Sequence, residues 1–445
     1  TLTGIPALTA GDIVEVHSSS NYTIATIPDG SVTNAKVDGS AAIQYSKLNL
    51  SDSIVDADVN SSAGIAASKL DFTQSGTGAT TRTVESKLRD VVSVKDFGAV
   101  GDGVADDTAA IQAAVDAAYQ RAINQQLVGS STYVNAAPCV YFPSGQYLTT
   151  QAIDNDTNRY LSLVGDGTSV LIGSGTRSHN FLTGSHTRIL NVENLHFQNY
   201  DTVFDVATNN LDSSQWTFKR VRSEAVNLFI DSRTFNTSRS TDVSFYDCVF
   251  QYGVNQIAKL FCDQVSFYNC WIGSGSSSTN SIEVNSNVTF VGCLFIPSGT
   301  SASGRAAVLL TNSDGEGGAA NDIMRGVSFY GCRMSNEGGQ GPIVVADYPI
   351  PEANLLNASP TISFDSCRLV GYSQNPYESG NSESGIVYLK QWPASISFTG
   401  CSFRSGGSAY GYLVAKSDSL ATSAPSTFKV SIDDSSYSNF LQQTG

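Results

Sequence analysis

Acidic side chains in the second half of the sequence are the residues best placed to do chemistry. Two carboxylates about 5 to 9.5 Å apart can hydrolyse a glycosidic bond, because one protonates the leaving group while the other activates water or attacks the sugar. Glu283 lies in a short apolar segment and is expected to point outward, whereas Asp314 and Glu316 follow in a longer polar segment. We predict these three residues as catalytic candidates. The alternative is that they are ordinary solvated acids of an acidic surface.

Three tyrosines, Tyr246, Tyr268 and Tyr330, occupy the same position in three copies of a repeated phrase. We expect them to face outward and to form a partial column. Exposed tyrosine rings stack well on sugars, and they are equally common where two subunits meet. We therefore predict a substrate-binding surface at these residues, with a subunit interface as a slightly favoured alternative.

The sequence lacks the residues that several other kinds of functional site need. The sequence has neither the Cys and His spacing of a zinc site nor a glycine loop that would cradle a phosphate. The acidic segment 314–318 lacks the alternating oxygen ligands of known calcium loops. We therefore predict that the protein has no metal and no cofactor.

The net charge of the chain limits which partners the protein is expected to bind. The 445 residues include 25 Lys and Arg against 40 Asp and Glu, which gives a net charge of −15. Such a chain repels phosphate backbones and anionic lipid, so we expect no nucleic-acid partner. No apolar run approaches the roughly 18 residues of a membrane span, so we also expect no membrane insertion.

A repeated sequence motif, called the phrase here, reads VSFYDCVF at 243–250, recurs in six copies and indicates how the chain is built. Apolar residues alternate with polar ones at its start, which predicts a strand with one buried face. Phe245 and Cys248 are three residues apart and yet both apolar, so we predict a tight bend between two inward-facing side chains. The second bend residue is always of a type that tolerates a left-handed backbone: Asp247, Asn269, Gly292, Gly331, Ser366 or Gly400.

Between these phrases lies a second, weaker apolar repeat, for example at 228–230, 282–284 and 308–310. Each repeat unit therefore carries about three short strands. A self-similar phrase of this kind marks a solenoid, in which equivalent residues stack about 4.8 Å apart. We predict a parallel β-helix, with six of the eight cysteines in an internal column of unpaired, small apolar side chains.

The segment 93–127 is expected to cap the first coil. Asp107 or Thr108 is a good helix N-cap, and an acidic pair before a helix suits its dipole. The following residues carry one apolar stripe at helical spacing: Ile111, Val115, Ala118 and Ala122. A solenoid needs such a lid over its terminal coil.

The segment 96–111, which reads DFGAVGDGVADDTAAI, resembles the N-terminal signature of pectate-lyase-superfamily β-helices, which is common in bacteriophage tailspikes. The resemblance implies an all-β fold. We expect a right-handed, single-stranded parallel β-helix over residues 91–445, preceded by a small stalk domain.

The first 90 residues resemble a different part of phage tail proteins. Residues 34–48 recur as 56–70, in a pattern similar to the stalk repeats of tail fibres, and 74–83 resembles a tailspike connector. We therefore expect residues 1–90 to form a stalk, virion-attachment and connector region. The resemblance implies a homotrimer in the virion tail, bound to other phage tail proteins through this region and assembled in the bacterial host cytoplasm.

The same resemblance implies a receptor-binding protein that recognises a host cell-surface polysaccharide and that could also depolymerise it. The residues leave the enzyme question open. A hydrolase is favoured over a lyase, because Arg220 and Arg222 have no acid cluster beside them that would hold calcium. The alternatives are an adhesin without activity and a structural tail adaptor.

Overall fold

The computed structural model describes two compact units, Thr1–Val84 and Glu85–Gly445. Apart from a few single residues, the described ranges are 62–124, 139–155, 160–184, 189–206, 214–232, 241–251, 253–260, 264–273, 280–284, 287–296, 306–311, 326–336, 342–347, 361–371, 385–390, 395–404, 412–417 and 428–438.

The first unit contains a small hairpin. Strand β1 (Asp71–Thr73) pairs antiparallel with β2 (Thr81–Thr83), after a short 3-10 helix η4 (Ala67–Lys69). The Thr73 and Thr81 hydroxyls lie 2.7 Å apart across the hairpin. The predicted connector 74–83 thus forms the hairpin loop and its second strand, whereas most of the predicted stalk repeat lies outside the described residues.

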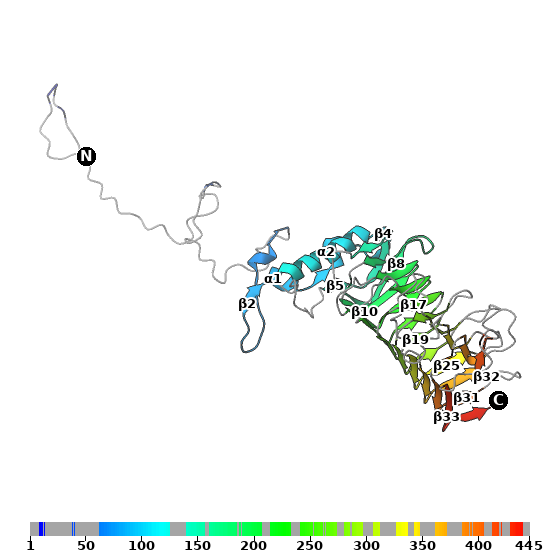
Figure 1. The fold of residues 1–445 in the computed structure, drawn as a ribbon. Coiled ribbons are helices and arrows are strands. Elements are labelled where there is room, and N and C mark those ends of the chain that lie inside the picture. The colour runs from blue at the N-terminus through cyan, green and yellow to red at the C-terminus, as the bar shows by residue number, and fades with distance from the viewer. Residues whose placement is uncertain are drawn as a thin grey trace. The chain divides into compact units, whose positions relative to one another are not determined.

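The second unit is a parallel β-helix, as the repeat predicts, and its right hand is the one that the family resemblance implies. Successive coils pair in parallel, and the core runs along the inside of the stack (Figure 1). Strands before the bend form the first arm: β3 (Val92–Ser93), β5 (Cys139–Phe142), β8 (Tyr160–Gly173), β10 (Ile189–Gln198), β12 (Ser214–Lys219), β15 (Thr241–Tyr246), β18 (Gln264–Tyr268), β21 (Asn287–Val291), β24 (Gly326–Tyr330), β27 (Thr361–Asp365), β30 (Ser395–Thr399) and β33 (Lys429–Asp433).

Strands after the bend form the second arm, which β8 and β10 enter without a break: β4 (Asp102–Asp106), β6 (Gly145–Thr149), β13 (Arg222–Glu224), β16 (Val249–Phe250), β19 (Trp271–Ile272), β22 (Leu294–Phe295), β25 (Arg333–Asn336), β28 (Arg368–Gly371), β31 (Ser402–Arg404) and β34 (Ser436–Ser438). A separate ten-stranded sheet, the third sheet, completes the coils: β7 (Ile153–Asp154), β9 (Leu182–Gly184), β11 (Thr202–Val206), β14 (Leu228–Asp231), β17 (Gln256–Leu260), β20 (Ile282–Val284), β23 (Val308–Leu310), β26 (Val344–Ala346), β29 (Gly385–Leu389) and β32 (Tyr412–Lys416).

The bend between the arms is the tight turn predicted from the phrase. All six predicted bend residues have positive φ, from 52° at Asn269 to 63° at Gly292. Asn194, Arg220 and Asp434 take the same conformation in other coils. The bend therefore repeats in coils whether or not they contain the cysteine.

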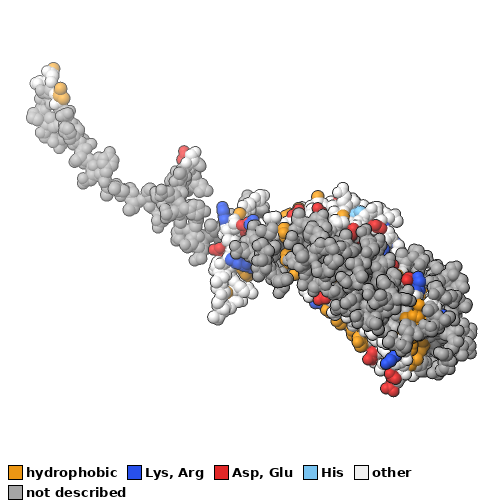
Figure 2. Space-filling model, viewed as in Figure 1, with side chains coloured by type: hydrophobic (Ala, Val, Ile, Leu, Met, Phe, Trp, Pro, Cys, Tyr) orange, Lys and Arg blue, Asp and Glu red, His pale blue; other side chains and the backbone are white. Residues whose placement is uncertain are grey.

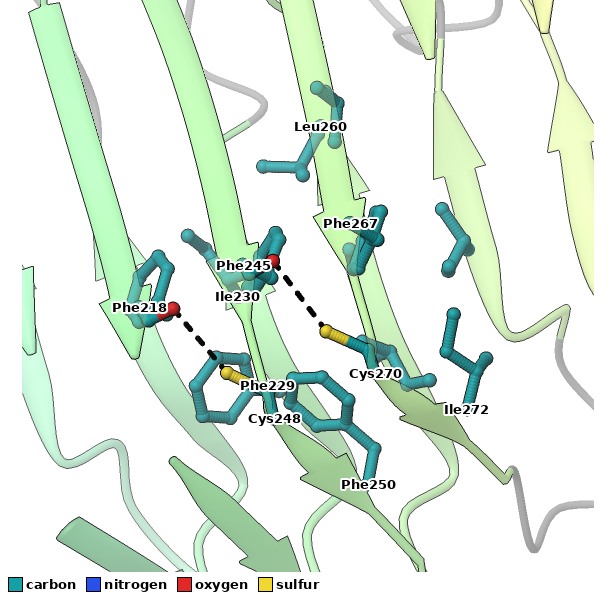
Figure 3. Close-up of a cluster of buried hydrophobic side chains, with 14 of the residues drawn as sticks. Phe218, Phe229, Ile230, Phe245, Cys248, Phe250, Leu260, Phe267, Cys270 and Ile272 are labelled. Carbon is teal, nitrogen blue, oxygen red and sulfur yellow. Dashed lines mark hydrogen bonds between the residues drawn. The ribbon is translucent and has the colours of Figure 1, made fainter. Parts of the chain in front are cut away.

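The core is a stack of aromatic rings beside the cysteine column. Phe245 and Phe267 stack with ring centroids 4.4 Å apart, and the stack continues coil by coil to Phe398. Figure 3 shows Cys248 and Cys270 beside these rings, each directed at the carbonyl oxygen of a phenylalanine in the preceding coil. All eight cysteines are free, so the column is held by packing and hydrogen bonds.

Helix α2 (Thr108–Asn124) caps the first coil and buries Ile111, Val115 and Ala118, as its apolar stripe predicts. The helix packs on β3, β5 and the 3-10 helix η5 (Val94–Phe97), and a short helix α1 (Val84–Leu88) precedes these elements. Asp107 stands at the predicted N-cap position, but its carboxylate accepts the backbone N–H groups of Val100 and Gly101. Asp107 therefore holds the turn that leads into the cap.

On the visible face of the described residues, acidic, basic and apolar side chains are interspersed (Figure 2). No helix in the described ranges is long and apolar enough to cross a membrane.

Candidate functional site

Glu283 lies on the outer face of the third sheet. Its neighbours Ile282 and Val284 belong to the buried core, and side chains alternate along a strand, so the Glu283 carboxylate points away from the core. The side chain is half-buried. The structure therefore has Glu283 facing outward, as its sequence pattern predicts.

Charged side chains from three preceding coils align with Glu283 on this face. The parallel register pairs Asp205 with Asp231, Asp231 with Lys259, and Lys259 with Glu283. Neighbouring strands of a sheet lie about 4.8 Å apart, so these residues follow one another at that interval. We call Asp205, Asp231, Lys259 and Glu283 the charged row.

The charged row contains a carboxylate pair with a separation that suits hydrolysis. Asp231 and Glu283 are two coils apart, which places their backbones about 10 Å from each other. Inverting glycosidases hold their two carboxyl groups about 6.5 to 9.5 Å apart, so that a water molecule fits between the base and the sugar. Lys259 lies between the two acids and can donate hydrogen bonds to a bound sugar.

Neighbouring amides orient two acids of the charged row. The Asn280 side chain donates to Oε1 of Glu283 over 3.4 Å, and its own oxygen accepts the backbone N–H of Ala306 at 3.0 Å. Asn180 donates in the same way to Oδ2 of Asp205 at 3.1 Å. Asp231 is only 8% exposed. These contacts limit the positions that the carboxylates can take.

Beyond Glu283 the same row of the sheet becomes apolar. The register continues from Glu283 to Leu309, and then to Val345, Tyr388 and Ala415. These four side chains form a second buried cluster, outside the main core, together with Ala306. Glu283 thus borders a water-poor surface, where charge interactions are stronger than in bulk water.

The predicted tyrosines lie on another face, the outer face of the first arm. Tyr246 and Tyr268 stack with ring centroids 4.9 Å apart and planes within 6° of parallel. Val291 occupies the next coil, and Tyr330, which is 45% exposed, follows it. The column is therefore partial, and it does not share a sheet with Glu283. Asp314 and Glu316 lie outside the described residues.

Neither Asp205 nor Lys259 is predicted from the sequence. Both residues, like Asp231 and Glu283, directly follow an inward apolar residue of a third-sheet strand. An alignment of these short strands would have revealed the row. The strands are separated by segments of unequal length, which hides the period.

A second group of titratable side chains lies on the second arm. His196 Nε2 is 3.7 Å from Oε1 of Glu224, and the Gln198 amide lies 3.3 Å from each of these two side chains. Burial lowers the pKa of His196, although the Glu224 carboxylate opposes this shift. Arg220, by contrast, binds Glu193 and Asn194 and is not available as a base. In the described part of the chain, no group of three or more His, Cys, Asp or Glu side chains could hold a metal ion.

A family model described as rhamnogalacturonase A/epimerase, pectate lyase-like, matches residues 91–338. This range covers more than half of the chain and includes α2, the first coils and Glu283.

Relatives among characterised proteins match over short stretches. The plasmin and fibronectin-binding protein A of Streptococcus pneumoniae is 36% identical over 110 residues, which are 24% of this chain and 13% of the relative. Mannuronan C5-epimerase AlgE5 of Azotobacter vinelandii is 54% identical over 55 residues, which are 12% of this chain and 4% of the relative. The chain thus spans only a small part of these relatives.

Solved structures share the fold. The tailspike protein of Acinetobacter phage vB_ApiP_P1 matches with a TM-score of 0.50 and 14% identity, over 79% of this chain and 59% of that one. The tailspike of Escherichia coli bacteriophage HK620 matches with a TM-score of 0.48 and 10% identity, over 84% and 71% of the two chains. At these identities the likeness concerns the β-helix alone.

Proposed function

The chain belongs to the rhamnogalacturonase A/epimerase, pectate lyase-like family, and on this basis we propose that it is a phage tailspike or tail fibre that binds a bacterial surface polysaccharide and hydrolyses it. The alignment of Asp231 and Glu283 in the charged row carries the proposal. The tailspike of Acinetobacter phage vB_ApiP_P1, which shares the fold, and the phage-type stalk repeats support a place in a phage tail.

The proposed reaction is hydrolysis with inversion at the anomeric carbon. One carboxyl group of the Asp231 and Glu283 pair protonates the leaving glycosidic oxygen, and the other takes a proton from a water molecule on the opposite face of the sugar. Lys259 holds a substrate hydroxyl between them, and Asn280 keeps the Glu283 carboxylate in position. Asp314 and Glu316, which lie outside the described residues, remain catalytic candidates from the sequence.

The test is incubation of the full chain with surface polysaccharides purified from a panel of bacterial strains. Chain length, reducing ends and unsaturated products are measured together, and NMR of the first product gives its anomeric configuration. We expect shorter chains, new reducing ends of inverted configuration and no unsaturation. Unsaturated ends would establish a lyase, and binding with unchanged chain length would establish an adhesin.

Matched variants connect the activity to the charged row. Glu283→Gln and Asp231→Asn each remove one charge without changing shape, and each is expected to lower kcat by at least about a hundredfold. Asp433→Asn removes a charge from the exposed outer face of the last first-arm strand and is the control, with unchanged activity expected. Equal activity in all three variants would place the chemistry elsewhere.

We further propose that the protein is a homotrimer of the virion tail, assembled in the host cytoplasm, whose N-terminal region binds other tail proteins. The repeats at 34–48 and 56–70 support this proposal, since small units of this kind bury little surface alone. The exposed Tyr330 and the stacked Tyr246 and Tyr268 suit either a subunit interface or a sugar platform. Sedimentation of the full chain measures the subunit number. A monomer at all concentrations would rule out the trimer, and a trimer that binds tail proteins but no glycan would indicate an adaptor.

A further inference from the structure

The outer face of the second arm has an unusual charge composition. In the six second-arm strands from β16 to β31, the only charged residues are Arg333, Arg368 and Arg404. The whole chain carries a net charge of −15, so a surface with arginines and no acids is not what its composition alone would give. This segregation indicates a specific role for the positive charge.

Two of these arginines are direct neighbours. The register pairs Leu294 with Arg333 and Arg333 with Arg368, so the two guanidinium side chains leave adjacent strands on the same face. Like charges in this arrangement destabilise a sheet. Among the described residues, neither arginine forms an ion pair that would offset the repulsion, and both are exposed. Arg404 adds a third positive charge diagonally, beside Val370.

The same row continues into an exposed aromatic platform. Trp271 precedes Leu294 in the register and is 39% exposed, and Val249 flanks it on the other side. The indole extends along its strand, since a Cβ added to Gly273 would lie only 3.7 Å from its Nε1. Ile296, on the neighbouring outward position, is 38% exposed. An indole held in this way offers a flat apolar surface to a ligand.

We propose that Trp271, Arg333 and Arg368 form a binding surface for a carboxylated polysaccharide. The two arginines present fork-shaped donors that match sugar carboxylates, and the indole packs against the apolar face of a pyranose ring. From Trp271 to Arg368 the row spans three coil intervals, about 14 Å along the axis of the solenoid. A linear acidic glycan can follow such a row, one side chain per coil.

This proposal rests on the proposed recognition of a glycan, and it adds that the glycan is acidic and meets the protein on a second face. Glu283 and its row belong to the third sheet, whereas Trp271, Arg333 and Arg368 belong to the second arm. The second-arm surface is thus an additional binding site that holds polysaccharide without cleaving it. A second copy of the chain is the competing occupant, because the chain itself is acidic.

The experiment measures binding of oligogalacturonate and of oligosialic acid to the full chain by titration calorimetry, with neutral dextran oligosaccharides of equal length as reference. We expect the acidic oligomers to bind, the neutral ones not to bind, and the affinity to fall as salt rises. Arg333→Gln/Arg368→Gln is expected to weaken binding by roughly tenfold or more for each arginine lost. Trp271→Ala is expected to weaken it by a similar factor.

The matched control is Lys219→Gln/Lys429→Gln, which removes two positive charges from the outer face of the first arm. We expect this variant to bind as the wild type does. The proposal is overturned if neither acidic oligomer binds, or if the control loses as much affinity as the arginine variant. It is also overturned if the arginine variant changes the sedimentation of the protein while oligomer binding is unaffected, because the face would then be a contact between copies. Loss of cleavage in Glu283→Gln is a separate result, since that residue lies on another sheet.

Discussion

The Sγ of Cys293 donates a hydrogen bond of 3.4 Å to the carbonyl oxygen of Phe267, one coil earlier. The same bond recurs at Cys248, Cys332 and Cys367. It follows from the bend, which turns each cysteine toward the phenylalanine carbonyl of the coil before it. The cysteine column is therefore a ladder of weak donors as well as a set of small apolar side chains.

Serine makes the same contact in two coils that lack the cysteine. Ser169 donates to the carbonyl of Phe142 at 2.7 Å, and Ser435 approaches the carbonyl of Phe398 at 3.5 Å. Both serines occupy the position of the cysteine in their coils. Leu195 and Val221, which have no donor, take this position in the two coils before Cys248, so the position accepts either a short donor side chain or an aliphatic one.

The first prediction concerns this donor. Cys293→Ala removes the hydrogen bond to Phe267 and leaves a small cavity, which is expected to lower the free energy of unfolding by about 1 to 3 kcal/mol. Cys293→Ser keeps a donor and is expected to lose less. Urea unfolding of the three proteins measures the difference, with the exposed Cys139→Ser as control. A serine variant less stable than the alanine variant would show that packing alone decides this position.

The second prediction is a loss of stability at high pH. Hydrogen bonding with Cys270, followed by burial, raises the pKa of Cys293 from 9.0 to about 12, and the same column raises the pKa of Cys332 to about 12. The folded protein therefore keeps these thiols protonated where the unfolded chain has released the protons. The stabilisation is complete below pH 9 and is lost as the pH rises from there toward 12.

Urea unfolding measured between pH 8 and pH 11 tests this prediction. We expect the free energy of unfolding to fall across the range, and to fall less steeply in Cys293→Ser, whose hydroxyl does not titrate there. Identical slopes in the two proteins would contradict it. In the native state at pH 8, a thiol reagent is expected to react quickly with Cys139 alone, because the other seven cysteines are buried.

The third prediction concerns the cap. Asp107 is 1% exposed and accepts two backbone N–H groups, from Val100 at 2.7 Å and from Gly101 at 3.1 Å. Asp107→Ala leaves both donors without this partner and is expected to cost about 3 kcal/mol, whereas Asp107→Asn keeps one acceptor oxygen and costs less. Thermal unfolding measures both variants. The exposed Asp96→Ala is the comparison, and a loss as large as that of Asp107→Ala would show that general charge, rather than the buried contact, matters.

The bend was predictable from the sequence because its left-handed backbone conformation restricts which residue types can occupy it. Only a few residues adopt a left-handed backbone easily, so Gly292, Asn269 and Asp247 mark the bend in their coils, whereas Arg220 takes the same conformation without this preference. The charged row was not predictable in this way. Asp231 and Glu283 meet through register between short strands, and no local preference marks an outward acid on a strand. Arg333 and Arg368 could not be predicted as neighbours either, because they are distant in sequence and become adjacent only through the strand register of the folded solenoid.

The last prediction uses substitutions at the bend to distinguish the cost of a left-handed backbone from the cost of a steric clash. Gly331 has φ of 59°, and a Cβ added there meets no atom within 4 Å. Gly331→Asn is expected to be nearly neutral, because Asn269 takes the same conformation in another coil. Gly331→Val has the same open space but a branched side chain, and is expected to lose about 1 to 2 kcal/mol from left-handed strain. Gly292→Asn is the steric counterpart, since its Cβ would lie 2.7 Å from Oδ1 of Asn269. If urea unfolding gave equal losses for Gly331→Asn and Gly331→Val, conformational preference would not explain the residues found at the bend.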